Sequence, residues 1–366
     1  MSLGWLLMII DQSVQVLEIA RVFNGLGFGM AYSAFPLYIG EIAMPKIRGA
    51  LTALATIGVP FGQFLASILN SKLSIQLCAI IYLIICAVLI VIFIILPDSP
   101  HNLMKRNKKE SAMEAIAWYR SNQGVKAEFE AIEQFVLMNG KSTFSDKLRQ
   151  FKNPPIIKAT IHIVILFTFM QLSGINSILF YMEDILTAAG IDVDMFEPSD
   201  MVILVNACGI FAASLAVPLI DRCGRRFLLV SSAFGLTVSL IGMMSHFILI
   251  KDSVDSSNLQ WLPIASTILF VCVYYSGFMT VPNTVLGEYF PADIKCIAAL
   301  IASMVGGAMS FLSSRTFNPM VKLIDYPYVF LYHAVCAFVI IPYGLIFFLE
   351  TKGKTLQEIQ DKLSRK

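Results

Sequence analysis

The sequence predicts an all-α, polytopic membrane protein made of two helical bundles. Of its 366 residues, 57% are hydrophobic and only 14% are charged, and the mean hydropathy is +0.73. Soluble domains carry roughly 25% charged residues, so this composition is typical of a chain whose solvent is largely lipid. Long uncharged runs recur along the chain, and each is close to the roughly 20 residues that a helix needs to cross a bilayer.

Nine of these runs are expected to cross the membrane. An apolar stretch at 1–10 precedes them; it is too short to cross and lacks the basic start and cleavage site of a signal peptide, so we interpret it as half a helix. The nine expected spans lie at 14–40, 49–70, 74–96, 157–181, 198–220, 227–250, 260–287, 296–314 and 327–349.

The charges between the spans predict the orientation, because Lys and Arg in short connections stay on the cytoplasmic side. One topology places 22 of the 27 Lys and Arg residues on that side, together with the C-terminus. The segment 182–200 then lies outside and is acidic. We therefore expect a multi-pass protein of the plasma membrane with a cytoplasmic C-terminus.

The same pattern predicts four regions. The bundle nearest the N-terminus is expected to be incomplete. A linker follows it, and this linker contains two stretches, 110–120 and 127–138, with apolar residues at helical spacing. The regions are an incomplete N-terminal bundle at 1–96, a cytoplasmic linker at 97–156, a six-helix C-terminal bundle at 157–349 and a cytoplasmic tail at 350–366.

Several classes of function are excluded by what the sequence lacks. The seven cysteines and four histidines are scattered singly, so no metal site, cofactor site or disulfide framework is expected. A net charge of +2 does not suggest a nucleic-acid partner. No cluster of nucleophile and base lies at catalytic spacing, so we do not expect an enzyme. The expected partners are a small solute and the lipid bilayer.

An internal repeat relates the two bundles. Glu41 with Arg48 matches Glu288 with Lys295, because each Glu follows a Gly and precedes a proline, a basic residue seven positions on and a new span. A second match joins 97–99 with 349–351, and the two segments are separated by nearly the same number of residues as the first pair. Parallel repeats of this kind are known from transporters.

The repeat also predicts how much of the first bundle is absent. The stretch of chain that precedes Glu41 is roughly 91 residues shorter than the stretch from the start of the second bundle to Glu288. That length corresponds to two spans and half of a third. The expected fold therefore lacks helices 1 and 2 and half of helix 3.

Charged residues gather at the cytoplasmic ends of the spans, where they remain close to water. Their repetition in both halves favours salt bridges that close one side of a transporter, although anchoring at the membrane interface would explain them too. Gly224 is expected to provide a tight turn among them. The expected gating residues are Glu41, Arg48, Asp221, Arg222, Arg225, Arg226, Glu288, Lys295 and Glu350.

These motifs resemble a known family. In order, the chain contains Arg21 followed by Gly25, Gly27 and Gly29, then PLYIGEIAMPKIRGAL, LPDSP, QLSGINSILFY, DRCGRR, GEYFPADIK and ETKGKT. They resemble the sugar-porter branch of the major facilitator superfamily, in particular insect facilitated trehalose and glucose transporters. The resemblance implies a twelve-helix carrier that works by alternating access, with its sugar between two six-helix bundles.

The resemblance also implies where a sugar would bind. Gln171 and Asn176 match the sugar-contacting amides of the family, and Asn206 lies near a third contact. Five residues apart, Gln171 and Asn176 diverge by about 140° on an ideal helix, so we expect Gly174 to break that helix. The alternative for each amide is an interhelical hydrogen bond, worth roughly 0.6 kcal/mol.

Several positions depart from the family pattern. Asn283 stands at the position of a stacking Trp, and we include it among the expected substrate-binding residues. Met170 and Thr56 replace sugar-binding Gln residues, Tyr275 replaces a buried Glu, and 306–307 is Gly-Gly in place of Asn-Trp. A pocket that loses hydrogen-bond partners for hydroxyls should bind a sugar weakly.

Two functions remain open at this stage. The first is facilitated diffusion of a sugar or related small solute, since no carboxylate in the interior of a span suggests a proton relay. The alternative is a non-transporting membrane protein with a degenerate sugar site, such as a truncated isoform, a regulator or an incomplete gene model.

Overall fold

The chain forms α-helices connected by short segments in the computed structural model, which describes residues 1–43, 45–120, 125–139, 144–191, 197–251, 259–291, 294–354 and 356–365. It divides into two compact units: unit 1 is Met1–Ala55 with Lys72–Arg149, and unit 2 is Thr56–Ser71 with Gln150–Lys366. The helix α3 contributes to both. The helices of the N-terminal half are α1 (Ser2–Ile10), α2 (Val14–Ile42), α3 (Pro45–Lys72), α4 (Ile75–Ile95), α5 (Pro100–Lys105), α6 (Lys109–Arg120), α7 (Val125–Asn139) and α8 (Phe144–Gln150).

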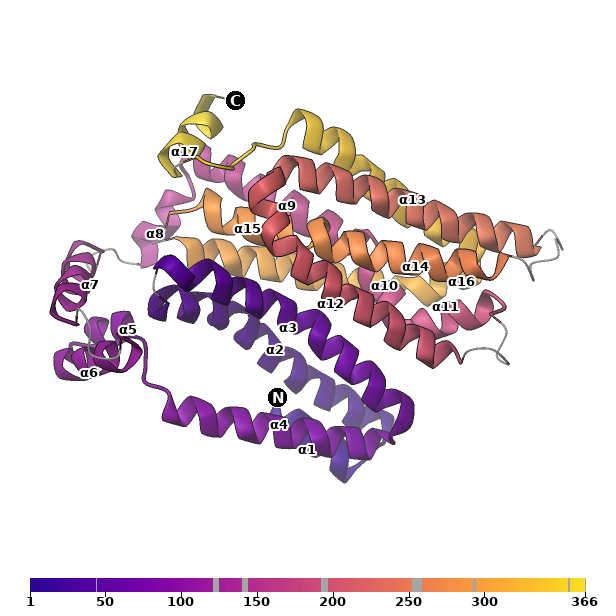
Figure 1. Cartoon of the computed structure of the whole chain (residues 1–366), viewed down its shortest axis with the longest axis horizontal. Coiled ribbons are helices and arrows are strands. Elements are labelled where there is room, and N and C mark those ends of the chain that lie inside the picture. Colours follow the sequence, from indigo (N-terminus) through magenta and orange to yellow (C-terminus); the bar gives the residue numbers. More distant parts are fainter. Residues whose placement is uncertain are drawn as a thin grey trace. The chain divides into compact units, whose positions relative to one another are not determined.

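Unit 2 holds the long helices of the C-terminal half, which lie lengthwise beside one another (Figure 1). One of its spans changes from α-helix to π-helix and back. The elements are α9 (Pro154–Leu172), α10 (Ile175–Phe180), α11 (Met182–Ala188), α12 (Pro198–Cys223), α13 (Arg225–Lys251), α14 (Trp261–Val273), the π-helix η2 (Tyr274–Phe278), α15 (Thr280–Tyr289), α16 (Lys295–Ile346) and α17 (Leu356–Arg365).

A helix lies at each expected span. Within the described residues, six helices are long and apolar enough to cross a membrane. Among them α4 has a mean hydropathy of 3.5 over its most apolar window, of which only 11% is buried inside the protein. A helix that is apolar on all sides and unburied by protein needs lipid around it, because water would solvate none of its faces well.

One connection differs from the prediction. The sequence predicts a loop between spans at 315–326, but α16 continues as helix through it and breaks only at Asp325, where φ is 67° and ψ is 162°. Pro327 explains the position of the break, because its ring nitrogen has no hydrogen to donate to the carbonyl of Leu323. Arg315 and Lys322 therefore lie within the helical part of this connection.

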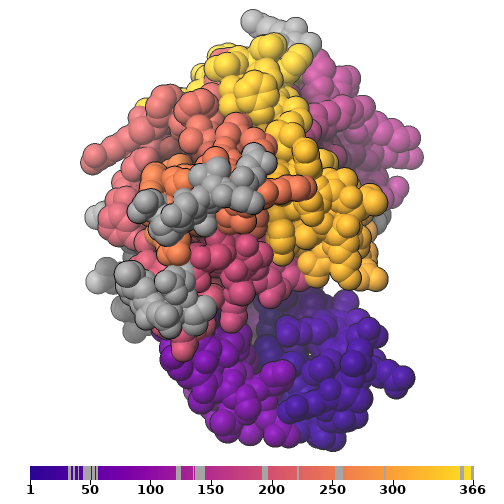
Figure 2. Space-filling view, turned by 90° about the vertical axis from the view of Figure 1, so that its right-hand side faces the viewer, coloured from indigo at the N-terminus to yellow at the C-terminus, as the bar shows by residue number. Residues whose placement is uncertain are grey.

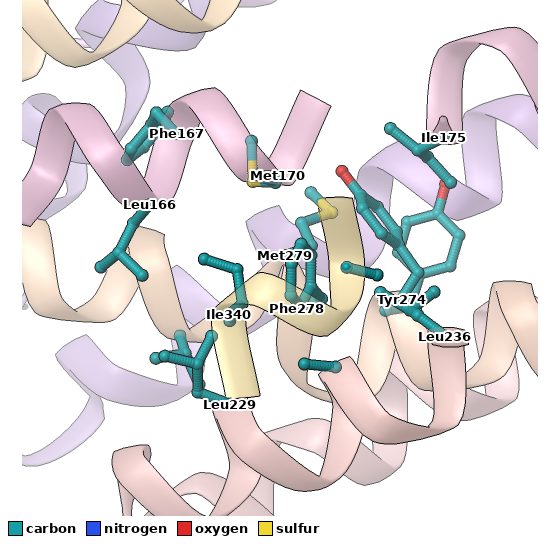
Figure 3. Packing of buried hydrophobic residues seen from close by; sticks show 14 of the residues in the cluster. Leu166, Phe167, Met170, Ile175, Leu229, Leu236, Tyr274, Phe278, Met279 and Ile340 are labelled. Atoms are coloured by element: carbon teal, nitrogen blue, oxygen red, sulfur yellow. The ribbon is translucent and has the colours of Figure 1, made fainter. Parts of the chain in front are cut away.

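The core of unit 2 lies where α9, α13, α16 and the η2 segment meet. Figure 3 shows Leu166, Phe167 and Met170 of α9 facing Phe278, Met279 and Ile340 across this core. All of these side chains are at most 8% exposed. In unit 1, α1 packs against α2 and α4, with Trp5 and Tyr82 in ring contact at 4.7 Å between centroids.

Candidate functional site

The first group of predicted residues lies at the break between α9 and α10. The chain turns at Gly174, whose φ of 89° favours glycine, and a Cβ there would approach the His333 ring to 2.8 Å. His333 Nδ1 lies 2.8 Å from the carbonyl oxygen of Leu172, one of the carbonyls that the broken helix leaves without a partner. The sequence predicted this break, and it lets the two amides on either side of it approach each other.

Gln171 and Asn176 meet across this break. Asn176 Nδ2 donates to Gln171 Oε1 at 2.5 Å. Gly306 of α16 lies against them, since a Cβ on it would come within 3.8 Å of Gln171 Nε2. The Gly at the position of a family Asn therefore leaves room beside the amide pair. Whether these amides bind a sugar remains a prediction.

The helix α10, and Tyr181 that follows it, contact α16 through a serine pair and a ring pair. The hydroxyls of Ser177 and Ser313 lie 3.1 Å apart, and the rings of Tyr181 and Phe317 stack at 5.1 Å with 12° between their planes. Figure 2 looks onto this end of unit 2, where the magenta surface of α10 and α11 borders the orange and yellow surface of α16. The broken span is thus positioned by packing on one side.

The other two predicted substrate-binding residues lie elsewhere in unit 2. Asn283 Nδ2 donates to the carbonyl of Met279, one turn earlier in the same span, at 2.9 Å. Asn206 lies on α12 and lines a polar cavity with Gln63 of α3. Gln63 also accepts a hydrogen bond from the hydroxyl of Tyr275. The sequence analysis did not select Gln63, because it is more than 140 residues from Asn206 in the chain.

A second group consists of charged residues at one end of unit 2. Arg225 Nη2 pairs with Glu288 Oε1 at 2.8 Å, and their side chains are only 11% and 27% exposed. Thr351 Oγ1 donates to the other oxygen of Glu288 at 2.5 Å. Arg225 also donates to the carbonyl of Ile220. A partly buried ion pair needs such additional hydrogen bonds to compensate for its desolvation.

Glu350 binds the start of α13. Its carboxylate accepts from the backbone N–H groups of Arg225 at 3.1 Å and Arg226 at 2.9 Å. A Cβ on Gly224, which has a φ of 88°, would lie 2.9 Å from Glu350 Oε2. Gly224 therefore provides both the turn predicted from the sequence and the space that the carboxylate occupies.

The remaining predicted gating residues of unit 2 surround this cluster. Arg226 Nε donates to the carbonyl of Gly344 at 2.9 Å, and the carbonyl of Arg222 accepts from Lys352 Nζ at 2.6 Å. Lys295 Nζ lies 3.4 Å from where a Cβ on Gly287 would be. The side chain of Asp221 lies outside the described residues.

Unit 1 contains a related arrangement. Glu41 accepts a hydrogen bond from the Ser99 hydroxyl. Arg120 pairs with Glu128 through two hydrogen bonds of 2.6 Å each and donates to the carbonyl of Ile42, the last residue of α2. The side chain of Arg48, the expected partner of Glu41, is not among those described. Neither Ser99 nor Arg120 was selected from the sequence, although Ser99 lies in the repeated tripeptide.

Two tyrosines share a carbonyl beside this cluster. The hydroxyls of Tyr38 and Tyr119 lie 2.7 Å apart, and both donate to the carbonyl oxygen of Pro97. Burial, with the hydrogen bond to Tyr38, raises the pKa of Tyr119 above its ordinary value. The Tyr119 hydroxyl therefore stays protonated in the physiological range, and the two hydroxyls tie α2 and α6 to the segment that follows α4.

Comparisons with known proteins agree on a transporter family. The family described as "Sugar (and other) transporter" matches residues 1–363. The facilitated trehalose transporter Tret1 of Bombyx mori is 29% identical over 369 residues, covering 99% of this chain and 71% of that protein. The Polypedilum vanderplanki protein of the same name is 28% identical and covered over 71% of its length, and the Anopheles gambiae one is 26% identical and covered over 45%.

Solved structures show the same fold. The major facilitator superfamily proton:xylose symporter XylE superposes with a TM-score of 0.75 at 20% identity, over 99% of this chain and 82% of that one. An inward-open XylE structure from E. coli gives a TM-score of 0.75 at 22% identity, over 95% and 73% of the two chains. The expected all-α transporter fold is confirmed.

Proposed function

Because the chain belongs to the sugar (and other) transporter family, we propose that it carries a sugar across the membrane by facilitated diffusion. It is a multi-pass membrane protein of the transporter type and not an enzyme. The curated relatives are facilitated trehalose transporters, so trehalose and its hexose unit are the first solutes to test.

The amide pair Gln171–Asn176 supports this proposal most directly. Sugars bind through hydroxyls, which both donate and accept hydrogen bonds, and an amide offers one acceptor and two donors. Polar side chains within a span are costly unless they serve a pathway or a neighbouring helix. Here the two amides lie together at a helix break, beside a glycine that leaves space.

The charged clusters support an alternating-access mechanism. Glu288 with Arg225 in unit 2, and Glu41 with Ser99 in unit 1, would hold helix ends together in one state and separate in the other. The basic inner connections support a cytoplasmic C-terminus. In this proposal the protein lies in the plasma membrane, with the ends of α10 and α11 facing outward.

Uptake of radiolabelled trehalose and glucose in oocytes tests the function. We expect uptake above that of uninjected cells, and Gln171→Ala should lower it about tenfold, the effect of losing one hydrogen bond to substrate. Ser214→Ala serves as the control, because Ser214 is exposed and, among the described residues, its hydroxyl bonds the carbonyl of Ile210 one turn earlier. Background uptake of both sugars by a chain detected at the cell surface would reject the proposal and favour a non-transporting role.

A further inference from the structure

A dense group of cations lies at the turn between α5 and α6 in unit 1. Four of the five residues from 105 to 109 are basic, and all five are exposed. Lys109 Nζ pairs with Glu133 at 2.5 Å, and Glu110 complements the dipole at the start of α6. The other three cations form no ion pair within the described part of the chain. We call them the cationic turn: Lys105, Arg106 and Lys108.

Backbone hydrogen bonds hold the cationic turn in one shape. The helix α5 ends at Asn107, whose φ of 59° is left-handed. The N–H groups of Asn107 and Lys108 donate to the carbonyls of Met104 and Leu103, at 3.0 Å each, which is the usual pattern of a helix that ends in a left-handed residue. The three cations are therefore fixed close together, and no described carboxylate relieves their mutual repulsion.

Further hydrogen bonds fasten α5 and α6 to the ends of longer helices. Ser99, the N-cap of α5, donates to Glu41 near the end of α2. Arg120, the last residue of α6, donates to the carbonyl of Ile42 at 2.9 Å. Figure 1 shows α5 and α6 beyond the end of α4, which is apolar enough to span a membrane.

The length of α5 limits how far the cationic turn can lie from the membrane. This helix has six residues, so it is about 9 Å long. Its first residue follows α4 after a connection of only four residues. The potential of an anionic membrane surface extends over about one Debye length, which is about 8–10 Å. The cationic turn therefore lies within reach of that potential.

An exposed tryptophan indicates that this surface meets lipid. Trp118 of α6 is 55% exposed, and its ring contacts that of Tyr119 with 4.9 Å between the centroids. The Tyr119 hydroxyl donates to the carbonyl of Pro97, two residues after α4 ends. Tryptophan is enriched where a membrane meets water, because its ring is apolar and its N–H is polar. Trp118 thus favours a lipid headgroup over a free anion as the partner of the cationic turn.

We propose that the cationic turn binds phospholipids whose headgroup carries more than one phosphate, the class of the phosphatidylinositol bisphosphates. Lys and Arg side chains offer donors and no acceptor, and phosphate oxygens are acceptors. Three cations on a fixed backbone match several negative charges better than the single net charge of phosphatidylserine. This binding does not depend on the transport of a sugar.

Fluorescence polarisation of the full chain in detergent measures the binding. The probe is fluorescent dioctanoyl phosphatidylinositol 4,5-bisphosphate, and the competitors are the same lipid without label, dioctanoyl phosphatidylserine and inositol 1,4,5-trisphosphate. We expect the unlabelled bisphosphate lipid to displace the probe about tenfold better than either of the others. Equal displacement by phosphatidylserine would show attraction to charge alone, and equal displacement by inositol trisphosphate would show a site for a free anion; either result overturns the proposal.

A triple variant tests the cationic turn itself. Lys105→Gln, Arg106→Gln and Lys108→Gln together should weaken probe binding about a hundredfold, because each cation near anionic headgroups contributes about fivefold. The matched control removes three exposed cations that are not adjacent in the chain and should leave the affinity unchanged. Its substitutions are Lys126→Gln, Arg149→Gln and Lys152→Gln. Equal losses in the two triple variants would mean that net charge, and not the cationic turn, binds the lipid.

The fluorescence of Trp118 tests its position at the membrane. Trp5→Phe and Trp261→Phe together leave Trp118 as the only tryptophan of the chain. In nanodiscs, a phospholipid with a nitroxide on its headgroup should quench this fluorescence more than one with a nitroxide at the end of its acyl chain. No quenching by the headgroup label would place α6 away from the membrane surface and overturn the proposal. Neither measurement uses sugar uptake, so this proposal and the proposed function fail separately.

Discussion

Glu350 connects the segment after α16 to the start of α13 through backbone amides. The first N–H groups of a helix have no partner within it, and a carboxylate satisfies them and complements the positive end of the helix dipole. Burial alone would raise the pKa of Glu350, but the N–H groups of Lys352, Arg226, Arg225 and Thr351 outweigh it and hold the pKa below its ordinary value of 4.5. The folded protein therefore favours the ionised form.

A pH dependence of stability follows from this lowered pKa. The contribution of Glu350 is complete above pH 4.5 and is lost as the pH falls from there through the lower folded pKa. Glu350→Gln should cost about 0.5–2 kcal/mol at neutral pH, as the loss of a helix cap does, and its unfolding temperature should depend less on pH below 4.5. Thermal unfolding in detergent between neutral and acidic pH measures this.

The control for this experiment is Glu114→Gln. Glu114 is an exposed carboxylate on α6, so its replacement should change neither the midpoint nor the pH profile. If Glu350→Gln and wild type lose stability in parallel below pH 4.5, Glu350 does not cap α13 in the way the structure indicates.

Residues close in sequence were predictable, and residues distant in sequence were not. Gln171, Gly174 and Asn176 lie within six positions; the family resemblance selected the two amides, and their divergence on an ideal helix suggested a break at Gly174. Arg225 and Glu288 were both selected for their charge, but only the packing of α13 against the η2 and α15 segments shows that they pair. The polar cavity was not predicted as a whole, because Gln63 and Asn206 in its lining come from spans that are distant in sequence.

At the scale of elements, the π-helix η2 sets how α14 and α15 pack on α13. A π-turn adds a residue to the helix, and Met279 N–H accordingly bonds the carbonyl of Tyr274, five residues earlier, at 2.9 Å. Thr280 Oγ1 donates to the carbonyl of Tyr275 at 2.7 Å. The hydrophobicity of the sequence predicted the span. The spacing of its apolar residues does not show whether one turn of the α-helix is widened to a π-turn.

Gly277 allows η2 to pack closely on α13. A Cβ on it would lie 2.6 Å from Ser232 Oγ and 2.7 Å from the backbone carbonyl of Leu228. Gly277→Ala should therefore force α13 and η2 apart and destabilise the protein by about 1–3 kcal/mol. Gly307→Ala is the matched control in α16, where the added carbon would meet no atom of another described element within 4 Å.

Thermal unfolding of the two alanine variants in the same detergent gives the comparison. Gly307→Ala should be neutral or stabilising by up to about 1 kcal/mol, the helix propensity of alanine over glycine. Equal midpoints for the two variants would mean that α13 and η2 do not pack as closely as the structure indicates.

At the scale of the whole molecule, the two halves repeat one chemical contact. Glu288 at the end of its span accepts from Thr351, and Glu41 accepts from Ser99. Each hydroxyl follows an acidic residue after a later span, and the tripeptides 97–99 and 349–351 were recognised as a repeat from sequence. The sequence did not show that the hydroxyl, rather than the acidic residue, contacts the repeated Glu.

This equivalence predicts equal effects from equivalent substitutions. Thr351→Val and Ser99→Ala each remove one hydrogen bond to a carboxylate, worth about 1.5–3 kcal/mol. If both bonds stabilise the same closed state of a transporter, each variant should raise the maleimide labelling rate of the exposed Cys296 in membrane vesicles about tenfold.

The effects should add in the double variant, because residues without shared partners act independently. Thr316→Val should leave the rate unchanged, because within the described part of the chain its hydroxyl bonds carbonyls of its own helix. A response to one substitution but not the other would show that the contact has different roles in the two halves, and that the repeat in sequence is not a repeat in mechanism.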